Sequence, residues 1–153
     1  MKSIFSFVFV AFLSVCTISC GKSGGGNGNN TTPDNKTKSV LIKITVSPVP
    51  GANTGSFVGS VLALLPNSGY ATWKVNGVTR TNENNISFTT TDLKNGIITL
   101  ETTASVNSAY LSISGVTVSQ YPFTVLVAPT INGTADSTLS IPVTATMQRS
   151  FTY

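Results

Sequence analysis

The sequence contains no histidine and only two cysteines, both within the first 20 residues. Without histidine there is no imidazole-based catalytic triad, no histidine-ligated zinc site and no side chain that ordinarily titrates near neutral pH. A domain that begins after these cysteines has no disulfide, no thiol nucleophile and no cysteine-based metal site. Charged residues make up only 9% of the chain. These absences remove most of the groups on which enzymes depend.

Acidic and basic residues are too scattered to form a charged binding surface. The net charge of +4 comes largely from the N-terminal residues, because residues 39–153 contain five basic and four acidic side chains. These nine residues are Lys43, Lys74, Arg80, Lys94, Arg149, Glu83, Asp92, Glu101 and Asp136. Nucleic-acid binding needs clustered cations that neutralise phosphates. We therefore expect no nucleic-acid partner.

The four carboxylates of this region show no spacing typical of a catalytic pair or a metal site. Glu83 belongs to the polar run 82–85, and Asp92 precedes a turn. Glu101 is expected on the outer face of a strand, and Asp136 lies in a loop. Glycoside hydrolysis needs two carboxylates across a cleft, and calcium takes six to eight oxygen ligands. We predict no enzymatic activity, no cofactor and no metal site.

The N-terminus carries the pattern of a signal peptide. Lys2 gives a basic start, an apolar run extends over residues 4–16, and small residues precede Cys20. A cysteine at the cut site followed by the polar stretch GKSGGG resembles the signal of bacterial lipoproteins, although Thr17 stands where leucine is commonest. The resemblance implies that residues 1–19 are removed and that Cys20 carries the lipid.

Two other outcomes remain open for this segment. Cleavage elsewhere would give a soluble secreted protein, and no cleavage would leave an anchor, although the apolar run is shorter than the ~20 residues of a spanning helix. We expect a cell-envelope protein held to a membrane by its lipid. Surface-exported lipoproteins of some bacteria carry acidic residues just after the cysteine, whereas here none precedes Asp34. This favours the periplasmic side, and the outer membrane is the membrane that we expect.

Residues 20–38 form a polar tract rich in glycine, asparagine, serine and threonine. With so little to bury, such a sequence is expected to be a disordered linker. A Gly-rich coil of this length has a root-mean-square span of about 23 Å. It would hold a folded domain just clear of a lipid headgroup layer.

Residues 39–153 predict one antiparallel β-sandwich, because short alternating runs of β-favouring residues are separated by glycine, proline and asparagine. The side chains expected to face the core are Val40, Ile42, Ile44, Val46, Ala71, Trp73, Val75, Ile86, Phe88, Ile98, Leu100, Ala109, Leu111, Ile113, Phe123, Val125 and Val127. Asn-Gly pairs at 76–77, 95–96 and 132–133 predict turns, the first a type I′ hairpin with positive φ at both residues.

Three further segments give more specific expectations. Residues 57–65 are almost continuously apolar, which predicts a strand buried on both faces, with a short helix as the alternative. Gly115 is expected to end the run that precedes it. Apolar residues at odd positions predict one half-buried strand over residues 139–153, and Pro142 predicts that this strand is an edge or is bulged, because proline cannot donate to a ladder.

The segments WKVNG, ISF and LKNGIITL within residues 73–103 resemble bacterial immunoglobulin-like and PKD-like domains. Those domains carry a core tryptophan on a central strand, a hairpin after it and a Leu-x-x-Gly turn into the next strand. The resemblance implies an immunoglobulin-like sandwich. The chain lacks the cysteine pair of antibody domains, and residues 116–153 exceed the minimal seven strands, so the strand order stays open. An unrelated antiparallel sandwich would show the same local pattern.

These observations favour a non-enzymatic binding or structural module with a protein or glycan partner. Two alternatives are a surface-fibre subunit in which residues 139–153 pair with a neighbouring copy by β-augmentation, and a carbohydrate-binding accessory lipoprotein. Alternation places Trp73 in the core rather than on a sugar-binding platform. The candidates for exposed aromatic side chains are Tyr70, Tyr110, Tyr121 and Tyr153. The sequence does not indicate an oligomeric state.

Overall fold

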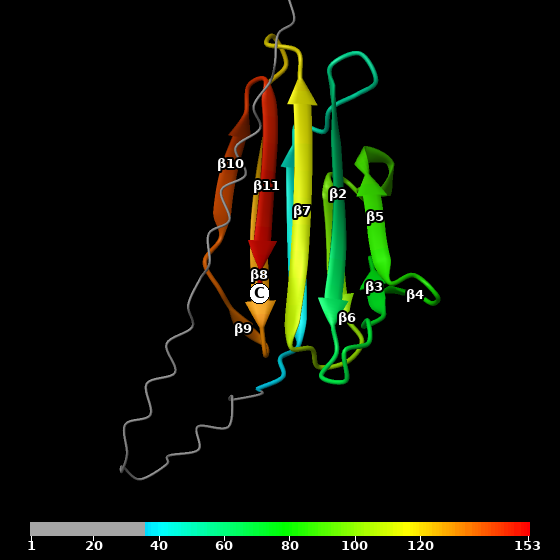
Figure 1. Ribbon diagram of the computed structural model, residues 1–153. Coiled ribbons are helices and arrows are strands. Elements are labelled where there is room, and N and C mark those ends of the chain that lie inside the picture. The colour runs from blue at the N-terminus through cyan, green and yellow to red at the C-terminus, as the bar shows by residue number, and fades with distance from the viewer. Residues whose placement is uncertain (1–35) are drawn as a thin grey trace, which may run out of the picture. The chain divides into compact units, whose positions relative to one another are not determined.

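The computed structural model describes residues 36–153, which form two antiparallel β-sheets packed face to face (Figure 1). The prediction of an all-β antiparallel sandwich is confirmed. Apart from one 3-10 turn, the described chain contains only strands and loops, and none of it is a helix long and apolar enough to cross a membrane. The signal peptide 1–19, the lipidation site Cys20 and nearly all of the linker 20–38 lie outside the described residues.

The elements follow one another with short connections. They are β1 (Val40–Ser47), β2 (Gly55–Leu64), β3 (Trp73–Val75), β4 (Val78–Arg80), β5 (Asn85–Thr89), the 3-10 turn η1 (Thr90–Asp92), β6 (Ile97–Thr102), β7 (Ser108–Thr117), β8 (Phe123–Ile131), β9 (Thr134–Ala135), β10 (Leu139–Val143) and β11 (Thr146–Thr152). Pairing begins one residue before the predicted domain start, where Lys38 and Val106 exchange two backbone hydrogen bonds of 2.9 Å.

The larger sheet has the order β10-β8-β1-β6-β3-β4, with β9 also paired to β8, and the smaller sheet has the order β11-β7-β2-β5. Successive strands largely alternate between the two sheets, so each sheet is built from segments far apart in the sequence. The expectation of more than seven strands is confirmed. The order of the strands, which the sequence left open, places β1 and β6 at the centre of the larger sheet.

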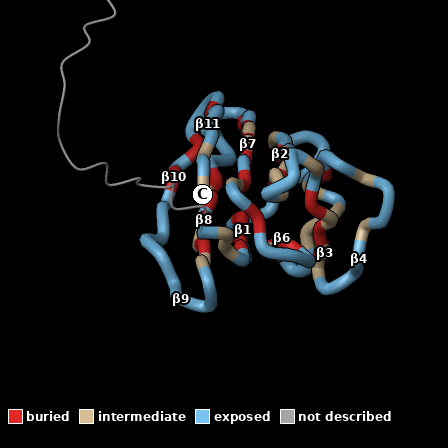
Figure 2. Tube along the Cα trace, turned by 60° about the horizontal axis from the view of Figure 1, so that its bottom comes forward, coloured by how far each residue is buried: buried red, intermediate tan, exposed pale blue. Residues whose placement is uncertain are grey.

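The core lies between the sheets and consists of the side chains that alternation assigned to the inner faces. Figure 2 shows buried residues concentrated where the two layers face each other. The 17 residues named above as facing the core, from Val40 to Val127, are all buried, and Trp73 has no exposed surface, so its predicted core position is confirmed. Its indole Nε1 is a buried side-chain nitrogen without a hydrogen-bond partner in the described chain. Trp73 therefore contributes through packing alone.

The three predicted Asn-Gly turns are present. Asn76, Asn95 and Asn132 have φ values of 50–52°, and the glycine after each has a φ of 77–82°. Positive φ at both central residues is the backbone of a type I′ turn, which matches the right-handed twist of paired strands. The 76–77 turn joins β3 to β4, and the 132–133 turn joins β8 to β9. These short loops fix the register of the strands that they connect.

The expectation that residues 57–65 are buried on both faces is wrong. They belong to β2, whose inner side chains Phe57, Val61 and Ala63 are buried, whereas Val58 on the other face is 43% exposed. No other layer of the described chain covers the outer face of the smaller sheet. Some apolar side chains of β2 therefore remain at the surface.

The prediction of a single strand over residues 139–153 is also wrong. The chain changes sheets between β10, which pairs with β8 in the larger sheet, and β11, which pairs with β7 in the smaller one. Ile141, Val143 and Met147 are buried as the odd-position pattern requires, but Leu139 at the start of β10 and Ala145 at the crossing are exposed. The alternation continues across the crossing because both β10 and β11 turn odd-numbered residues toward the same core. Pro142 lies on an edge strand, as predicted.

A proline explains why β9 and β10 are separate strands. Pro129 lies within β8, and its carbonyl oxygen accepts a 2.9 Å hydrogen bond from the Asp136 amide. In a strand, the carbonyl and the N–H of one residue point to the same side. Proline has no N–H, so at Pro129 β8 accepts a hydrogen bond from the neighbouring chain but cannot donate one to it. Residues 136–138 leave the ladder at that point, and pairing resumes at Leu139.

Two glycines on the inner face of the smaller sheet make room for phenylalanine rings. A Cβ placed on Gly59 would lie 2.3 Å from Cζ of Phe88, and one placed on Gly115 would lie 2.9 Å from Cζ of Phe123. Gly115 therefore does not end its strand, contrary to expectation, and β7 continues through it to Thr117. The missing side chains allow a flat backbone surface against which the rings pack.

We expect Gly59→Ala to destabilise the domain by about 1–3 kcal/mol, the usual cost of overpacking a filled core. Besides the ring, the added methyl group would lie 3.0 Å from the carbonyl oxygen of Ser112. Urea denaturation followed by tryptophan fluorescence measures the loss. The double variant Gly59→Ala with Phe88→Leu should lose less free energy of unfolding than the sum of the two single variants, because the smaller side chain relieves the clash with the added methyl group.

Gly51→Ala is the matched control, since its nearest neighbour would be Oγ1 of Thr54 at 3.8 Å. Its effect should stay within about 0.5 kcal/mol. Equal losses at positions 51 and 59 would contradict the packing account.

Candidate functional site

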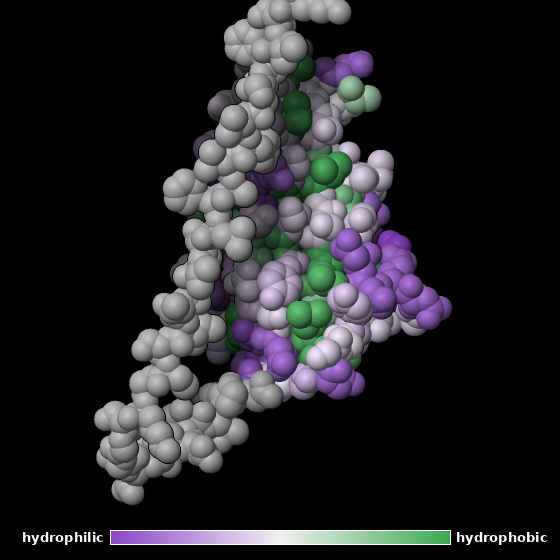
Figure 3. Space-filling model, viewed as in Figure 1, coloured by the Kyte–Doolittle hydropathy of each residue, from purple (hydrophilic) through white to green (hydrophobic). Residues whose placement is uncertain are grey.

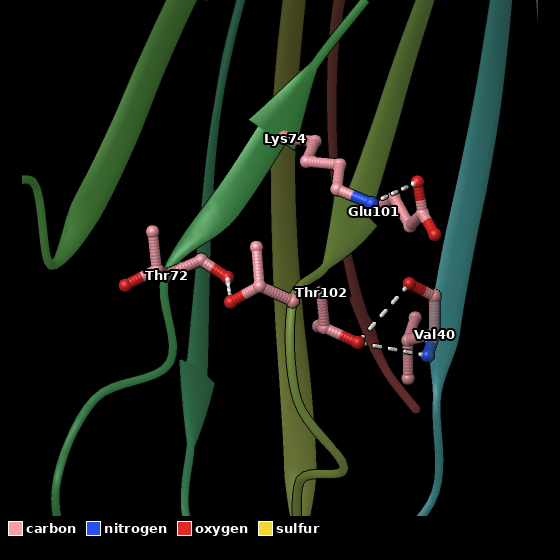
Figure 4. Close-up of polar contacts among 6 residues, drawn as sticks. Val40, Thr72, Lys74, Glu101 and Thr102 are labelled. Carbon is pink, nitrogen blue, oxygen red and sulfur yellow. Dashed lines mark hydrogen bonds and ion pairs between the residues drawn. The ribbon is translucent and has the colours of Figure 1, made fainter. Parts of the chain in front are cut away.

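The structure does not bring the acidic side chains together. Glu101 lies 3.5 Å from Nζ of Lys74 on the outer face of the larger sheet (Figure 4), and Glu83 lies 3.5 Å from Nη1 of Arg80. Asp92 accepts a 2.8 Å hydrogen bond from the Thr89 amide and caps the 3-10 turn. Each of these carboxylates has a local structural partner.

The polar run 82–85 contains one carboxylate as a possible calcium ligand, and this carboxylate, Glu83, pairs with Arg80. The remaining acidic residue, Asp136, accepts a 2.7 Å hydrogen bond from the Ser137 amide in an exposed loop. Residues 36–153 contain no group of three acidic side chains placed to hold a metal ion.

Two threonines at the end of β6 bond backbone groups of neighbouring segments of the larger sheet. The hydroxyl of Thr102 accepts a 3.1 Å hydrogen bond from the Val40 amide and donates one of 3.4 Å to the Val40 carbonyl (Figure 4). The Thr103 hydroxyl donates a 3.0 Å bond to the carbonyl of Thr72. These threonines satisfy backbone groups of Val40 and Thr72 and have a structural role.

The four tyrosines divide into two groups. Tyr70, Tyr110 and Tyr121 are 41–52% exposed, as predicted. Tyr153 is half-buried, so its prediction as an exposed aromatic is wrong. Its ring stacks on Phe151 at a centroid distance of 6.3 Å, and it packs against the hydrophobic core. Of the exposed tyrosines, Tyr110 lies in a strand rather than in a loop.

The outer face of the smaller sheet is the surface most distinct from the rest of the domain. We call it the neutral face. Its outward positions, read from the strand register, are Asn85, Ser87 and Thr89 on β5, Ser56, Val58, Ser60, Leu62 and Leu64 on β2, Ser108, Tyr110, Ser112, Ser114 and Val116 on β7, and Thr146, Gln148, Ser150 and Thr152 on β11. None of these residues is an aspartate, glutamate, lysine or arginine. Figure 3 shows this face as pale and green, with purple at its margins.

A row of four serines crosses the neutral face. The register pairs Ser150 with Ser112, Ser112 with Ser60, and Ser60 with Ser87, so one serine comes from each of the four strands. Ser87 and Ser150 are exposed, and the two central serines are half-buried. Neighbouring strands are ~4.8 Å apart, which makes the row ~14 Å long. We call it the serine row.

Two open depressions of about 280 and 300 Å³ lie along the serine row and share Ser60 and Ser112. Val58 borders the first, and Leu62 and Tyr110 border the second. Leu62 and Tyr110 are directly paired across β2 and β7. The depressions combine hydroxyl groups with apolar flanks, a composition typical of surfaces that orient a ligand by a few polar contacts.

The outer face of the larger sheet has a different character. Lys43, Lys74 and Glu101 project from its central strands, and the last two form an ion pair. A larger depression of about 400 Å³ between the β3–β4 hairpin and η1 is lined by Arg80, Asp92 and Lys94. Since Arg80 and Asp92 already have partners within the fold, this depression offers fewer available groups than the neutral face.

Sequence analysis missed the neutral face, although it identified Tyr110. The four serines of the row are separated in the sequence by up to 90 positions, and only the strand register places them in line. The available signal was the outward half of each alternating run. Those positions carry serine and threonine, with no charged residue in β2, β5 or β7.

The fold is similar to that of solved structures from Bacteroides and Parabacteroides species. One is a DUF4425 family protein from Bacteroides ovatus, with a TM-score of 0.59, 13% identity, and coverage of 77% of this chain and 95% of that chain. Another is a DUF4425 domain of unknown function from Bacteroides vulgatus, with a TM-score of 0.59, 13% identity, and coverage of 76% and 94%. A third is the calcium-bound form of a protein from Parabacteroides distasonis, with a TM-score of 0.56, 16% identity, and coverage of 82% and 99%.

The sequence itself matches no protein-family profile and no curated protein. The similarity to the solved structures therefore establishes the sandwich fold of this chain and nothing further.

Burial raises the pKa of Tyr153 from 10.0 to about 12, and the negative charge of Asp136 acts in the same direction. The unfolded chain therefore releases this proton at a lower pH than the folded one. The sandwich should lose stability as pH rises from 10 toward 12 and keep the full contribution below pH 10. Urea denaturation at pH 9 and pH 11 measures the loss.

Tyr153→Phe should show a smaller loss between these pH values than the wild type, because phenylalanine has no proton to release. Tyr70→Phe, at an exposed position, is the control and should keep the wild-type loss. A Tyr153→Phe variant that lost as much stability as the wild type between pH 9 and pH 11 would show that the loss does not come from ionisation of Tyr153.

Proposed function

We propose that this chain is a lipid-anchored, non-enzymatic binding module of the bacterial cell envelope and that the neutral face is its binding surface. The anchor rests on the N-terminal sequence, in which Cys20 follows a signal-type apolar run. Stable attachment to a bilayer needs more than one acyl chain, which a multiply acylated N-terminal cysteine supplies. The outer membrane, facing the periplasm, is the location that we propose.

The composition of the neutral face is the observation that carries the binding role. Folded domains usually place charged side chains on exposed surfaces. Four adjacent strands with no charged residue at an outward position are exceptional in this chain, since the opposite sheet carries Lys43, Lys74 and Glu101 on its outer face. A surface kept uncharged and lined by hydroxyl groups suits a ligand that carries no charge of its own.

A non-enzymatic role fits the positions of the acidic side chains. Glu83 and Glu101 form ion pairs, and Asp92 caps a turn. The neutral face offers hydroxyls and one phenol but no acid–base pair. Binding rather than turnover is therefore the chemistry available there.

Calcium binding belongs to the Parabacteroides distasonis protein, and we do not extend it to this chain. Calcium sites use several carboxylates, whereas those of residues 36–153 lie apart and have local partners.

A fibre subunit is the weaker candidate. It would require residues 139–153 to leave their own sheets and pair with another copy. Ile141, Val143 and Met147 of this segment lie in the core, and exposing buried side chains of this size costs several kcal/mol in total. The segment is thus an integral part of the domain's own sandwich.

The anchor predicts that the purified native protein begins at Cys20 and carries acyl groups. Intact-mass analysis should show this addition, and the protein should partition into the detergent phase of a two-phase extraction. Cys20→Ala should lose the acyl mass. A native protein that begins at another residue, or that stays entirely aqueous, would exclude lipid anchoring.

The binding surface predicts that one charge placed in the middle of the neutral face abolishes binding. Detergent-solubilised mature protein is sedimented with envelope material from which lipid has been extracted. Ser60→Lys should reduce the bound fraction at least tenfold, because the ammonium group would be desolvated without a counter-charge. Near-UV circular dichroism of the variant confirms folding.

Thr124→Lys is the matched control, because Thr124 is a half-buried, outward-facing hydroxyl residue on β8, an internal strand of the other sheet. It should bind as the wild type does. Equal binding by the Ser60→Lys and Thr124→Lys variants would show that the neutral face is not the contact surface.

A further inference from the structure

We propose that the ligand of the neutral face is an uncharged polysaccharide whose chain lies across the strands along the serine row. The inference rests on the function proposed above and names the ligand class for that same surface. It follows from four properties of the face: its charge, its hydroxyl groups, its spacing and its apolar borders.

The absence of charge excludes most charged polymers. A polyanion such as nucleic acid or an acidic glycan needs cations at the contact surface. The one cation on the four strands is Arg149, which lies on the edge strand β11. Its register position is one that faces inward rather than toward the neutral face. Its Nη1 donates a 3.0 Å hydrogen bond to the carbonyl oxygen of Gln148. The neutral face therefore offers no counter-charge to an ionic ligand.

The hydroxyl groups of the serine row are available to a ligand. The side chains of Ser60, Ser87, Ser112 and Ser150 make no hydrogen bond to the described chain. A serine hydroxyl donates one hydrogen bond and accepts others, so it can meet either role of a sugar hydroxyl. Because the row is open to solvent, exchange of water for sugar keeps these groups satisfied.

The spacing of the row suits an extended chain of sugars. Its serines repeat at the strand separation of ~4.8 Å, which is close to the rise per sugar unit in an extended β-linked glycan. Each successive sugar along the row would therefore meet an equivalent hydroxyl. A row ~14 Å long spans about three such units. Repetition of a weak contact along one polymer raises the overall affinity without any deep pocket.

Apolar side chains border the row on both sides, as a sugar ring requires. Tyr110 pairs with Leu62 on one side, and Val58 borders the other. One face of a pyranose ring presents C–H groups, which pack on the face of an aromatic ring, while its rim presents hydroxyls. Tyr110 is 41% exposed and combines an apolar ring with a polar tip. The two depressions along the row would receive the sugars.

A protein partner fits this surface less well. Protein–protein interface cores are enriched in aromatic residues, methionine and arginine and depleted in serine. The centre of the neutral face has the opposite composition, with serine on all four strands. Among the macromolecules of an envelope, a neutral glycan matches it best.

Native affinity electrophoresis of the mature lipoprotein tests the inference. The protein is kept in a polyoxyethylene detergent, which carries no sugar. Gels contain mixed-linkage β-glucan, xyloglucan, xylan or galactomannan, and a parallel gel contains polygalacturonate. At least one neutral polymer should retard the protein to an extent that 1 M NaCl does not change, and polygalacturonate should not retard it.

Tyr110→Ala should weaken the affinity derived from the retardation roughly tenfold, which is the upper end of the range for one aromatic contact. Adding Ser60→Ala and Ser112→Ala to this variant should weaken the affinity further. Tyr121→Ala is the matched control, because Tyr121 is 52% exposed and lies in the β7–β8 loop, off the neutral face. It should be retarded as the wild type is. Unchanged thermal unfolding shows that each variant is folded.

Three results would overturn the inference. The first is that none of the four neutral polymers retards the wild type. The second is that Tyr121→Ala weakens binding as much as Tyr110→Ala does. The third is concentration-dependent self-association, detected by sedimentation velocity and abolished by Ser60→Lys, which would assign the face to a second copy. If sedimentation with envelope material still depends on Ser60 in the first case, the proposed binding role stands and only the glycan assignment fails.

Discussion

The core between the two sheets is overwhelmingly apolar, and the rings of Phe88 and Phe123 are buried in it. Each ring occupies space left by a glycine on the inner face of the smaller sheet, at Gly59 and Gly115. Phe57 lies beside Phe88 with a centroid distance of 6.1 Å. No disulfide is available to this domain, so stability depends on how completely these side chains fill the core. Because the inner faces supply that stability, the outer faces are left to differ in composition.

Much of the fold could be predicted from alternation and turn residues. Val40, Ile42 and Ile44 repeat with the period of a half-buried strand, and Asn-Gly pairs supply the positive φ that tight hairpins need. The crossing between β10 and β11 could not be predicted, because both strands turn odd-numbered residues toward one core. Parity along a strand does not say which sheet the strand joins. The apolar run in β2 led to the wrong prediction of a strand buried on both faces, because local composition does not show whether another layer covers the sheet.

The candidate site was less accessible to sequence analysis than the fold. Residues such as Ser60 and Ser150 are individually unremarkable, and their meaning comes from register across four strands. Register follows from long-range pairing, which a single sequence does not reveal. Tyr110 was recognisable as a candidate for exposure, but so was Tyr153, which the stacking on Phe151 removes from the surface. The difference lies in tertiary packing around chemically identical rings.

The central position of β1 has a mechanical consequence. This strand is hydrogen-bonded along its length to β8 on one side and along its second through sixth residues to β6 on the other, and the chain enters it at Lys38. Tension transmitted through the preceding residues pulls β1 lengthwise between its two neighbours. Lengthwise sliding strains the bonds of both ladders together, whereas peeling an edge strand would break them in succession. A domain held at this end is therefore built to resist shear.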